Sequence, residues 1–324
     1  MPQINEQQVG ATGYGLMGFT WRPDPTPHEQ AFEAMRAALD NGMNFWNGGE
    51  FYGTPECNSM TLLEAYFAQY PEDADKVVLS IKGGFGPHGP DGSPEGTRRS
   101  IDNVIKQLNG RKKLDIFECA RRDPSVPMED TFRTMQEYID KGLLGGISLS
   151  EVAASTIHEA VKHAKIVAVE VELSIFSPEV LTNGVAAACA EYGIPLVAYS
   201  PIGRGILGGS LKSQSDLSPA LRIFPRFSPE NFSNNLNLFT HVNALAQKKG
   251  CTPAQLALAW TRCLSRRPGM PTIIPIPGST KASRVQENAV EVELTDAEMD
   301  EIDGILARFE VKGERYPGHI TMNT

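Results

Sequence analysis

The sequence predicts an α/β fold, a single (β/α)8 TIM barrel in which eight strands alternate with helices. Short apolar strand-like runs and helix-like runs alternate along the whole chain, and eight such strands are expected. No change of composition marks a linker, so residues 1–324 are expected to form one domain. Polar residues follow the strands, at the end where the chemistry of such barrels lies. A doubly wound open sheet is the competing interpretation.

The expected strands are short and mostly apolar, as strands buried on both faces of a sheet are. The first ends at Gly18. The second runs from Met43 to Trp46 and leads into Asn47 and the pair Gly48-Gly49, where the chain can turn sharply. The other six strands are expected at residues 77–82, 114–120, 146–150, 166–171, 194–200 and 272–276.

Helices are expected between these strands. The first begins at Thr26-Pro27-His28-Glu29, which has the pattern of a capping box with proline in the first turn. A long loop rich in Gly, Ser, Pro and Asn is expected from Pro201 to about Asn235. The other helices are expected at residues 60–70, 97–108, 128–141, 155–163, 180–192, 238–249, 253–262, 281–290 and 296–308.

Residues 13–18, GYGLMG, spell the glycine fingerprint GxGxxG of dinucleotide-binding folds. That fingerprint requires a helix that opens at the glycines and an acid about 20 residues further on. Here Pro23, Pro25 and Pro27 follow, and no helix is expected to open at the glycines. We therefore assign these glycines to a tight first barrel strand rather than to a Rossmann fold.

Composition argues against several classes of protein. The chain is 41% hydrophobic and 21% charged, with a formal net charge of −9 and a pI of about 5.3. Such a charge argues against a nucleic-acid or membrane-surface binder, and no apolar run approaches the roughly 20 residues that span a bilayer. The five cysteines fall in no metal-ligand spacing and are expected to be reduced thiols. With no signal-peptide pattern at the N-terminus, a cytoplasmic or nuclear location is expected.

A tyrosine and a lysine at neighbouring strand ends indicate acid catalysis. Tyr52 follows the strand that ends near Asn47, and Lys82 ends the next strand. A free tyrosine has a pKa of about 10 and is too weak an acid to work well at neutral pH. A nearby ammonium group is expected to lower the pKa of Tyr52 and make it a proton donor to a carbonyl oxygen. The alternative is an ordinary turn with Tyr52 packed over it.

Residues 275–288 have the pattern of an anion site. A strand, a turn at Gly278, two hydroxyl groups and the start of a helix follow one another, and N–H groups at a helix N-terminus bind phosphate. Lys281 and Arg284 add two cations, which suits a phosphomonoester such as the 2′-phosphate of NADP. A capped helix with solvated basic residues is the alternative.

Together these motifs resemble the aldo-keto reductases. The resemblance covers residues 13–288 and rests on GFTW at 18–21, the spacing Asn47…Tyr52…Lys82, LSE at 149–151, YSPIG at 199–203 and PIPGS at 275–279 with Arg284, Glu287 and Asn288. It implies a barrel that binds NADPH and reduces carbonyl compounds without a metal.

The resemblance also implies roles for single residues. Tyr52 is the implied general acid, Lys82 adjusts its pKa, and Asn47 accompanies them. Ser150, Glu151 and Glu170 match the positions that hold the nicotinamide carboxamide, and Tyr199 matches the aromatic that stacks on the ring. The full set implied to bind the cofactor is Thr20, Trp21, Asn47, Ser150, Glu151, Glu170, Tyr199, the pyrophosphate loop Ser200, Pro201, Ile202, Gly203 and Arg204, and the phosphate and adenine contacts Gly278, Ser279, Thr280, Lys281, Arg284, Glu287 and Asn288.

The chain departs from the family pattern at three positions. Asn47 stands where an aspartate is usual, Ala120 where a histidine is usual, and Glu170 where glutamine is more common. Losing the histidine removes a donor on the oxyanion side, a loss on the order of several kcal/mol. The fungal-type pyridoxal reductases are similar to this chain in having asparagine and alanine at the first two positions. That resemblance implies reduction of the pyridoxal aldehyde, an activated aldehyde for which Ala120 would leave room.

The expected partner is a small-molecule aldehyde, with no nucleic acid, membrane or metal, and the oligomeric state stays open. The residues expected to line its pocket are Trp21, Trp46, Phe51, Phe85 and Arg121. Residues 222–227 are expected near the pyrophosphate. The alternatives are a broad aromatic aldehyde or carbonyl reductase and an NADPH-sensing subunit that turns over slowly.

Overall fold

The computed structural model describes residues 1–318 and 322, and in this part of the chain eight parallel strands form one sheet. The first and last strands meet in a parallel bridge between Gly15 and Gly278, so the sheet closes on itself. The predicted barrel is therefore confirmed, and the open sheet is wrong. In order around the barrel the strands are β3 (Tyr14–Gly15), β4 (Phe45–Gly49), β5 (Val78–Gly83), β8 (Leu114–Cys119), β9 (Leu144–Ser150), β10 (Ile166–Glu172), β11 (Leu196–Tyr199) and β12 (Ile273–Pro275).

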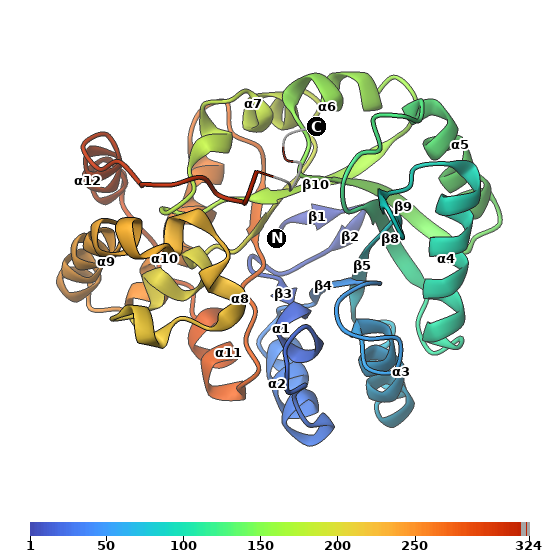
Figure 1. Cartoon of the computed structure of the whole chain (residues 1–324), viewed down its shortest axis with the longest axis horizontal. Coiled ribbons are helices and arrows are strands. Elements are labelled where there is room, and N and C mark those ends of the chain that lie inside the picture. The colour runs from blue at the N-terminus through green and yellow to red at the C-terminus, as the bar shows by residue number, and fades with distance from the viewer. Residues whose placement is uncertain (319–321, 323–324) are drawn as a thin grey trace.

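Helices surround these strands (Figure 1). The outer helices bury one face, as in α4 (Pro94–Leu108), where the buried Ile101, Val104 and Leu108 recur every three or four residues. The others are α1 (Met17–Thr20), α2 (His28–Asp40), α3 (Ser59–Gln69), α5 (Met128–Asp140), α6 (Ala154–Ala160), α7 (Val185–Glu191), α8 (Pro219–Arg222), α9 (Pro229–Lys249), α10 (Pro253–Cys263), α11 (Ala282–Ala289) and α12 (Asp296–Leu306). Within the described residues, each helix is too short or too polar to cross a lipid bilayer.

A short N-terminal hairpin fills one end of the barrel. It consists of β1 (Gln3–Ile4) and β2 (Gln7–Gln8), which pair antiparallel. Ile4 is fully buried and packs with Phe45 and Val78, the first residues of β4 and β5. The hairpin therefore closes the N-terminal end of the barrel and leaves the opposite end for chemistry. Sequence reasoning missed it, because the segment is mostly polar.

The alternation of side chains along β4 corrects the expected role of Trp46. Successive strand residues point to opposite faces of a sheet, and Phe45 and Asn47 lie inside the barrel. Trp46 points the other way, is fully buried and stacks on Phe67 of α3 with ring centroids 5.9 Å apart. Trp46 therefore belongs to the core between strand and helix, and its assignment to the substrate pocket is wrong.

Two expected features near the N-terminus are also wrong. The first strand ends at Gly15, not Gly18, and the short helix α1 follows directly, because the first proline stands only at Pro23. The capping box does not form at the start of α2. Pro27 is its N-cap residue, and the buried Thr26 hydroxyl has no hydrogen-bond partner among the described residues.

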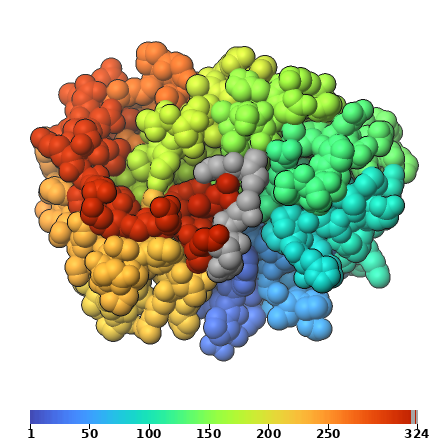
Figure 2. All heavy atoms as spheres, turned by 45° about the horizontal axis from the view of Figure 1, so that its top comes forward, coloured from blue at the N-terminus to red at the C-terminus, as the bar shows by residue number. Residues whose placement is uncertain are grey.

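The segment expected to be a loop up to Asn235 contains the start of a long helix. α9 begins at Pro229, with proline in its first turn and Glu230 beside it. Asn235, fully buried, explains why the asparagine-rich run is ordered: its Nδ2 atom donates to the carbonyls of Arg226 and Lys312, each at 2.8 Å. Figure 2 shows the C-terminal segment, in red, lying along the gold part of the chain.

Candidate active site

Four polar side chains meet inside the barrel, and we call them the Lys82 cluster: Asn47, Lys82, Glu118 and Glu170. Lys82 Nζ lies 2.7 Å from Asn47 Oδ1, 2.5 Å from Glu170 Oε1 and 3.3 Å from Glu118 Oε1. Asn47 Nδ2 also donates to Glu170 Oε2 at 2.6 Å. None of the four is more than 6% exposed. The barrel interior therefore holds one ammonium group and two carboxyl groups.

Strand register brings the cluster together. Lys82 at the end of β5 stands beside Gly49 of β4 on one side and Glu118 of β8 on the other. Sequence reasoning predicted three members of the cluster and missed Glu118. The available signal was an acid two residues before Ala120 in a buried strand, since residues two apart share a face.

Tyr52 lies over the turn that follows β4. Its ring covers Gly49, where a Cβ atom would stand 2.9 Å from three ring atoms, so the position requires glycine. Thr20 at the end of α1 donates its hydroxyl to the Tyr52 carbonyl at 2.7 Å. Lys82 Nζ is 6.0 Å from the centre of the Tyr52 ring. The tyrosine is thus fixed by its backbone and placed next to the Lys82 cluster.

The protonation of Tyr52 differs from the sequence-based expectation. Burial raises the pKa of Tyr52 to about 12, Lys82 opposes the rise, and Glu170 and Glu118 add to it. The expected net lowering by Lys82 is wrong, because burial of the phenol outweighs the effect of the ammonium group and the two carboxyl groups beside it add to the rise. Tyr52 therefore stays protonated throughout the neutral range, in the form that can donate a proton.

Aromatic rings surround Tyr52 at the barrel mouth. The Trp21 ring is 5.0 Å from the Tyr52 ring, Phe51 is 5.1 Å from it, and Phe85 is 4.9 Å from Phe51, measured between centroids. Trp21 is 53% exposed and Phe85 37%, unusual for rings of this size, so both present apolar surface to solvent. Three of the predicted pocket residues therefore form one wall beside Tyr52.

Arg121, the remaining predicted pocket residue, follows the C-terminal end of β8. Its guanidinium carbon is 5.7 Å from the centre of the Tyr316 ring. Arg121 Nη1 also donates to the carbonyl of Ala120 at 2.5 Å. Ala120 itself is buried and bonded through its N–H to the carbonyl of Gly83.

The residues expected to hold a nicotinamide carboxamide gather at the ends of β9 and β10. Ser150 Oγ is buried and has no hydrogen-bond partner among the described residues, which suits a polar group of a ligand. Glu170 belongs to the Lys82 cluster. Glu151 accepts a hydrogen bond from the Tyr199 hydroxyl at 2.8 Å, so the expected aromatic residue lies beside these groups.

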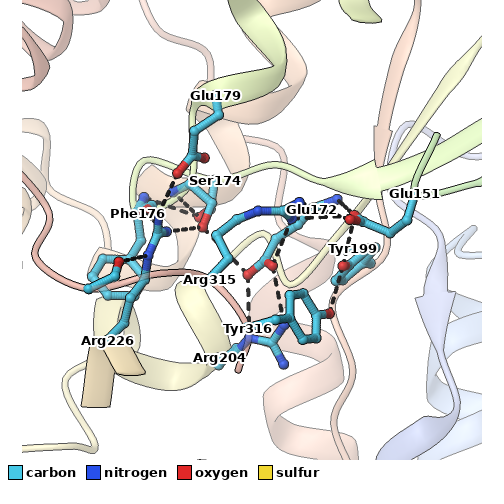
Figure 3. A network of polar contacts seen from close by, with 12 residues as sticks. Glu151, Glu172, Ser174, Phe176, Glu179, Tyr199, Arg204, Arg226, Arg315 and Tyr316 are labelled. Carbon is cyan, nitrogen blue, oxygen red and sulfur yellow. Dashed lines mark hydrogen bonds and ion pairs between the residues drawn. The ribbon is translucent and has the colours of Figure 1, made fainter. Parts of the chain in front are cut away.

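A buried ion-pair network links Glu151 to the C-terminal segment (Figure 3). Arg315 Nη2 is 2.8 Å from Glu151 Oε2, and Arg315 Nη1 is 3.1 Å from Glu172 Oε2. Burial opposes ionisation of Glu151, but the charge and hydrogen bonds of Arg315 outweigh it and hold the pKa of Glu151 below its usual range. The Tyr199 and Tyr316 hydroxyls are 2.8 Å apart. Sequence reasoning missed Glu172, Arg315 and Tyr316.

Replacing Arg315 by glutamine is expected to destabilise the protein by about 3 kcal/mol, because it removes one partner from buried ion pairs with two carboxylates. Thermal unfolding of the variant measures this loss. Lys312→Gln is the control, because Lys312 lies in the same segment and its ion pair with Glu310 is exposed. Equal melting temperatures for the two variants would contradict the importance of the network.

The pyrophosphate loop follows β11. Ser200 and Arg204 have positive φ values of 51° and 56°, so the backbone turns sharply there, with Pro201, Ile202 and Gly203 between them. Arg204 is held by Glu172, with its Nη2 atom 3.2 Å from Glu172 Oε2. Residues 222–227 approach the neighbouring loop after β10: Arg226 donates to the Phe176 carbonyl and to Ser177 Oγ, and pairs with Glu179.

The predicted anion site lies at the start of α11. Lys281 is its N-cap residue, and no side chain caps the helix. Arg284 is exposed and pairs with Glu287 at 2.5 Å, three residues later on the same face. The turn before the helix is anchored on other elements, because Tyr14 donates to the Ser279 carbonyl at 2.5 Å and Gln30 to the Thr280 carbonyl at 2.7 Å. Gly278 makes the barrel-closing bridge, and Asn288 is buried on the helix.

Comparison with known proteins decides the family. Residues 11–307 match the model of the aldo/keto reductase family. The chain belongs to this family. A Schizosaccharomyces pombe protein named "Probable pyridoxal reductase 2" is 41% identical, over 98% of this chain and 97% of its own length. A Saccharomyces cerevisiae protein, whose name also assigns it provisionally as a pyridoxal reductase, is 38% identical over 94% and 95%.

Solved structures agree on the architecture of this aldo/keto reductase. A glycerol dehydrogenase from Gluconobacter oxydans aligns with a TM-score of 0.80, over 97% of this chain and 96% of its own, at 20% sequence identity. At that identity the likeness shows the fold alone. Membership of the family makes the protein an oxidoreductase that acts on aldehydes or alcohols with a nicotinamide cofactor.

Proposed function

We propose that this aldo/keto reductase reduces the aldehyde of pyridoxal to pyridoxine with NADPH, and that Tyr52 donates the proton to the carbonyl oxygen. The observation that carries the proposal is the pair of relatives named as pyridoxal reductases, 41% and 38% identical over nearly the full length of the chain. The site agrees with this substrate class, because an aromatic aldehyde can pack against the Trp21, Phe51 and Phe85 rings.

The cofactor supplies the hydride when it is bound. We assign Ser150, Glu151 and Glu170 to the carboxamide, and the unpartnered Ser150 hydroxyl supports the fit. Tyr199 is assigned to the nicotinamide ring and residues 200–204 to the pyrophosphate. Thr20, Trp21 and Asn47 complete the face beside Tyr52. The described residues contain no cluster of three or more His, Cys, Asp or Glu side chains arranged to hold a metal ion.

The preference for NADPH is assigned to Lys281 and Arg284. Replacing Arg284 by glutamine is expected to weaken NADPH binding about 10-fold and leave NADH binding unchanged, because a charge-assisted bond to the 2′-phosphate is lost. Titrating both nucleotides against protein fluorescence measures this. Arg133→Gln is the matched control: Arg133 is 62% exposed against 61% for Arg284, and each pairs with an acid three residues away. Equal losses for NADPH and NADH would refute the assignment.

The room left by Ala120 is assigned to the substituted ring of the substrate. Ala120→His is expected to raise KM for pyridoxal about 10-fold or more and to affect a small aldehyde such as propanal much less, because an imidazole is much larger than the buried methyl group of Ala120. Steady-state kinetics with the two aldehydes measure the difference. A variant that keeps full pyridoxal turnover would exclude this steric role.

The deciding experiment follows NADPH oxidation by the purified protein with pyridoxal, beside 4-nitrobenzaldehyde. Higher kcat/KM for pyridoxal is the expected result. Faster reduction of the nitrobenzaldehyde would instead indicate a broad aromatic aldehyde reductase. Tight NADPH binding with negligible turnover of both aldehydes would indicate a sensing subunit and overturn the proposal.

A further inference from the structure

We propose that Glu118 and Glu170 together carry a single negative charge opposite Lys82, with one proton shared between the two carboxyl groups. Tyr52, the proposed proton donor, then faces a cluster of zero net charge. This inference rests on the proposed role of Tyr52, but the charge state itself does not depend on which aldehyde is reduced.

The geometry of the cluster is the first argument. The two carboxyl groups approach the same ammonium group, Glu170 at 2.5 Å and Glu118 at 3.3 Å. Lys82 is the only described cation within 4.0 Å of either of them. The Glu118 and Glu170 side chains are 0% and 3% exposed, so water does not screen their mutual repulsion.

The remaining neighbours of the two carboxyl groups are neutral. Asn47 of β4 donates to Glu170, and Ser148 of β9 donates to Glu118 Oε2 at 2.9 Å. Tyr52 is protonated at neutral pH. The Tyr199 hydroxyl, on β11, is bonded to Glu151. Glu151 and Glu172 are themselves paired with Arg315 rather than with the cluster.

Charge balance then decides the protonation. With both carboxyl groups ionised, the buried cluster would hold a net charge of −1, and an uncompensated buried charge is costly. With one proton shared, the cluster is neutral, as in other sites where two carboxyl groups share a proton. Burial and the neighbouring Glu118 raise the pKa of Glu170 well above its usual range despite the opposing effect of Lys82, in agreement with the balance.

The shared proton bears on position 47, where asparagine stands in place of the aspartate that is usual in the family. Asn47 brings no charge to Lys82, so the counter-charge comes from β8 and β10 instead. Because two carboxyl groups supply one charge, loss of either leaves the other to ionise. Tyr52 therefore faces a neutral cluster whether both carboxyl groups are present or only one, and it keeps its proton to high pH.

Infrared spectroscopy of the full chain without cofactor tests the shared proton. At neutral pH, we expect a carbonyl stretch from one buried protonated carboxyl group, absent from both Glu118→Gln and Glu170→Gln. Glu118→Asp should keep the band, because the shorter acid preserves the second carboxyl group. Glu50→Gln is the control. Glu50 is a partly buried acid near Tyr52 whose pKa burial raises, but it bonds to Ser100 and Asn103 outside the cluster.

Three results would overturn the proposal: no protonated carboxyl band in the wild type, loss of the band only in Glu50→Gln, or its loss in only one of the two cluster variants. Ser148→Ala removes a hydrogen bond from Glu118 without removing charge and should keep the band. The infrared measurements need no catalytic turnover, so they test the shared proton even if pyridoxal is not the substrate.

A kinetic measurement tests the effect on Tyr52. The alkaline limb of the pH profile for 4-nitrobenzaldehyde reduction should move little in Glu118→Gln. In Glu118→Gln/Glu170→Gln it should move to lower pH by about one unit or more, because an unbalanced ammonium group favours loss of a proton from Tyr52 or Lys82. An equal downward shift in Glu118→Gln and the double variant would overturn the proposal. The infrared bands of the single variants decide the case if the double variant does not fold.

Discussion

Replacing Tyr52 by phenylalanine is expected to lower kcat for aldehyde reduction by about 10³-fold, within the range that general acids contribute. The substitution removes only the phenolic oxygen. The ring still fits over Gly49 and between Trp21 and Phe51, so the pocket wall and the fold are preserved. Single-turnover and steady-state NADPH oxidation measure the loss, and fluorescence titration is expected to show unchanged NADPH affinity.

Tyr138→Phe is the matched control for this variant. Tyr138 is 6% exposed against 8% for Tyr52, and its hydroxyl bonds to Asp102 on the outer layer of helices. Loss of the hydroxyl there should leave kcat unchanged. If Tyr52→Phe retained more than about a tenth of the wild-type kcat, another group would have to supply the proton, since even weak general acids contribute about 10²-fold.

The fold could be predicted from local pattern because strand and helix periods alternate without interruption. Errors occurred where local pattern and tertiary contacts disagree. Asn235 is a poor helix former in sequence terms, yet its hydrogen bonds to residues 226 and 312 stabilise α9 at a point expected to be a loop. The N-terminal hairpin is ordered by Ile4 and Val9 inside the barrel, a contact that the polar sequence around them does not reveal.

The site residues, too, could be predicted where local pattern was enough and were missed where distant parts of the chain meet. Lys82 lies near the end of β5 and Tyr52 lies three residues after β4, so their position could be predicted from the strand ends. Arg315 lies 164 residues from Glu151 along the chain, and no periodic pattern connects them. Trp46 was placed on the wrong face and Glu118 was missed, because successive residues of a strand point to opposite faces of the sheet. Trp46 points away from the barrel interior, and Asn47, the next residue, points into it. Starting from one residue of each strand that points into the barrel and alternating the faces along the strand would have corrected both errors.

Replacing Lys82 by methionine is expected to have the second large effect, on stability and activity together. Methionine leaves Glu118 and Glu170 buried without a cation, and removal of one partner from a buried ion pair costs about 3–5 kcal/mol. Loss of the ammonium group also removes the one effect that lowers the pKa of Tyr52, and kcat is expected to fall about 10²-fold or more. Urea unfolding and steady-state kinetics measure the two losses.

The stability loss in Lys82→Met should depend on pH in a defined direction. The pKa of Glu170 is raised in the folded protein, and without Lys82 it rises further, so the folded state binds more protons than the unfolded chain. Stability conferred by such a group is present below the unfolded pKa, about 4.3, and is lost as pH rises through the folded pKa. The difference between wild type and variant should therefore grow from pH 5 to pH 8.

Lys112→Met provides the comparison that isolates the cluster. Lys112 is as buried as Lys82, at 6% exposed, but it pairs with a single carboxylate, Asp115, which also accepts the Leu79 N–H at 2.8 Å. Lys112→Met should lose stability while keeping kcat, and its loss should change less with pH, because Asp115 retains a donor. If both variants lost stability equally at every pH, the two carboxyl groups beside Lys82 would not be acting as a coupled pair. The pH dependence thus separates a buried lysine that only supports the fold from one whose charge is balanced within the active site.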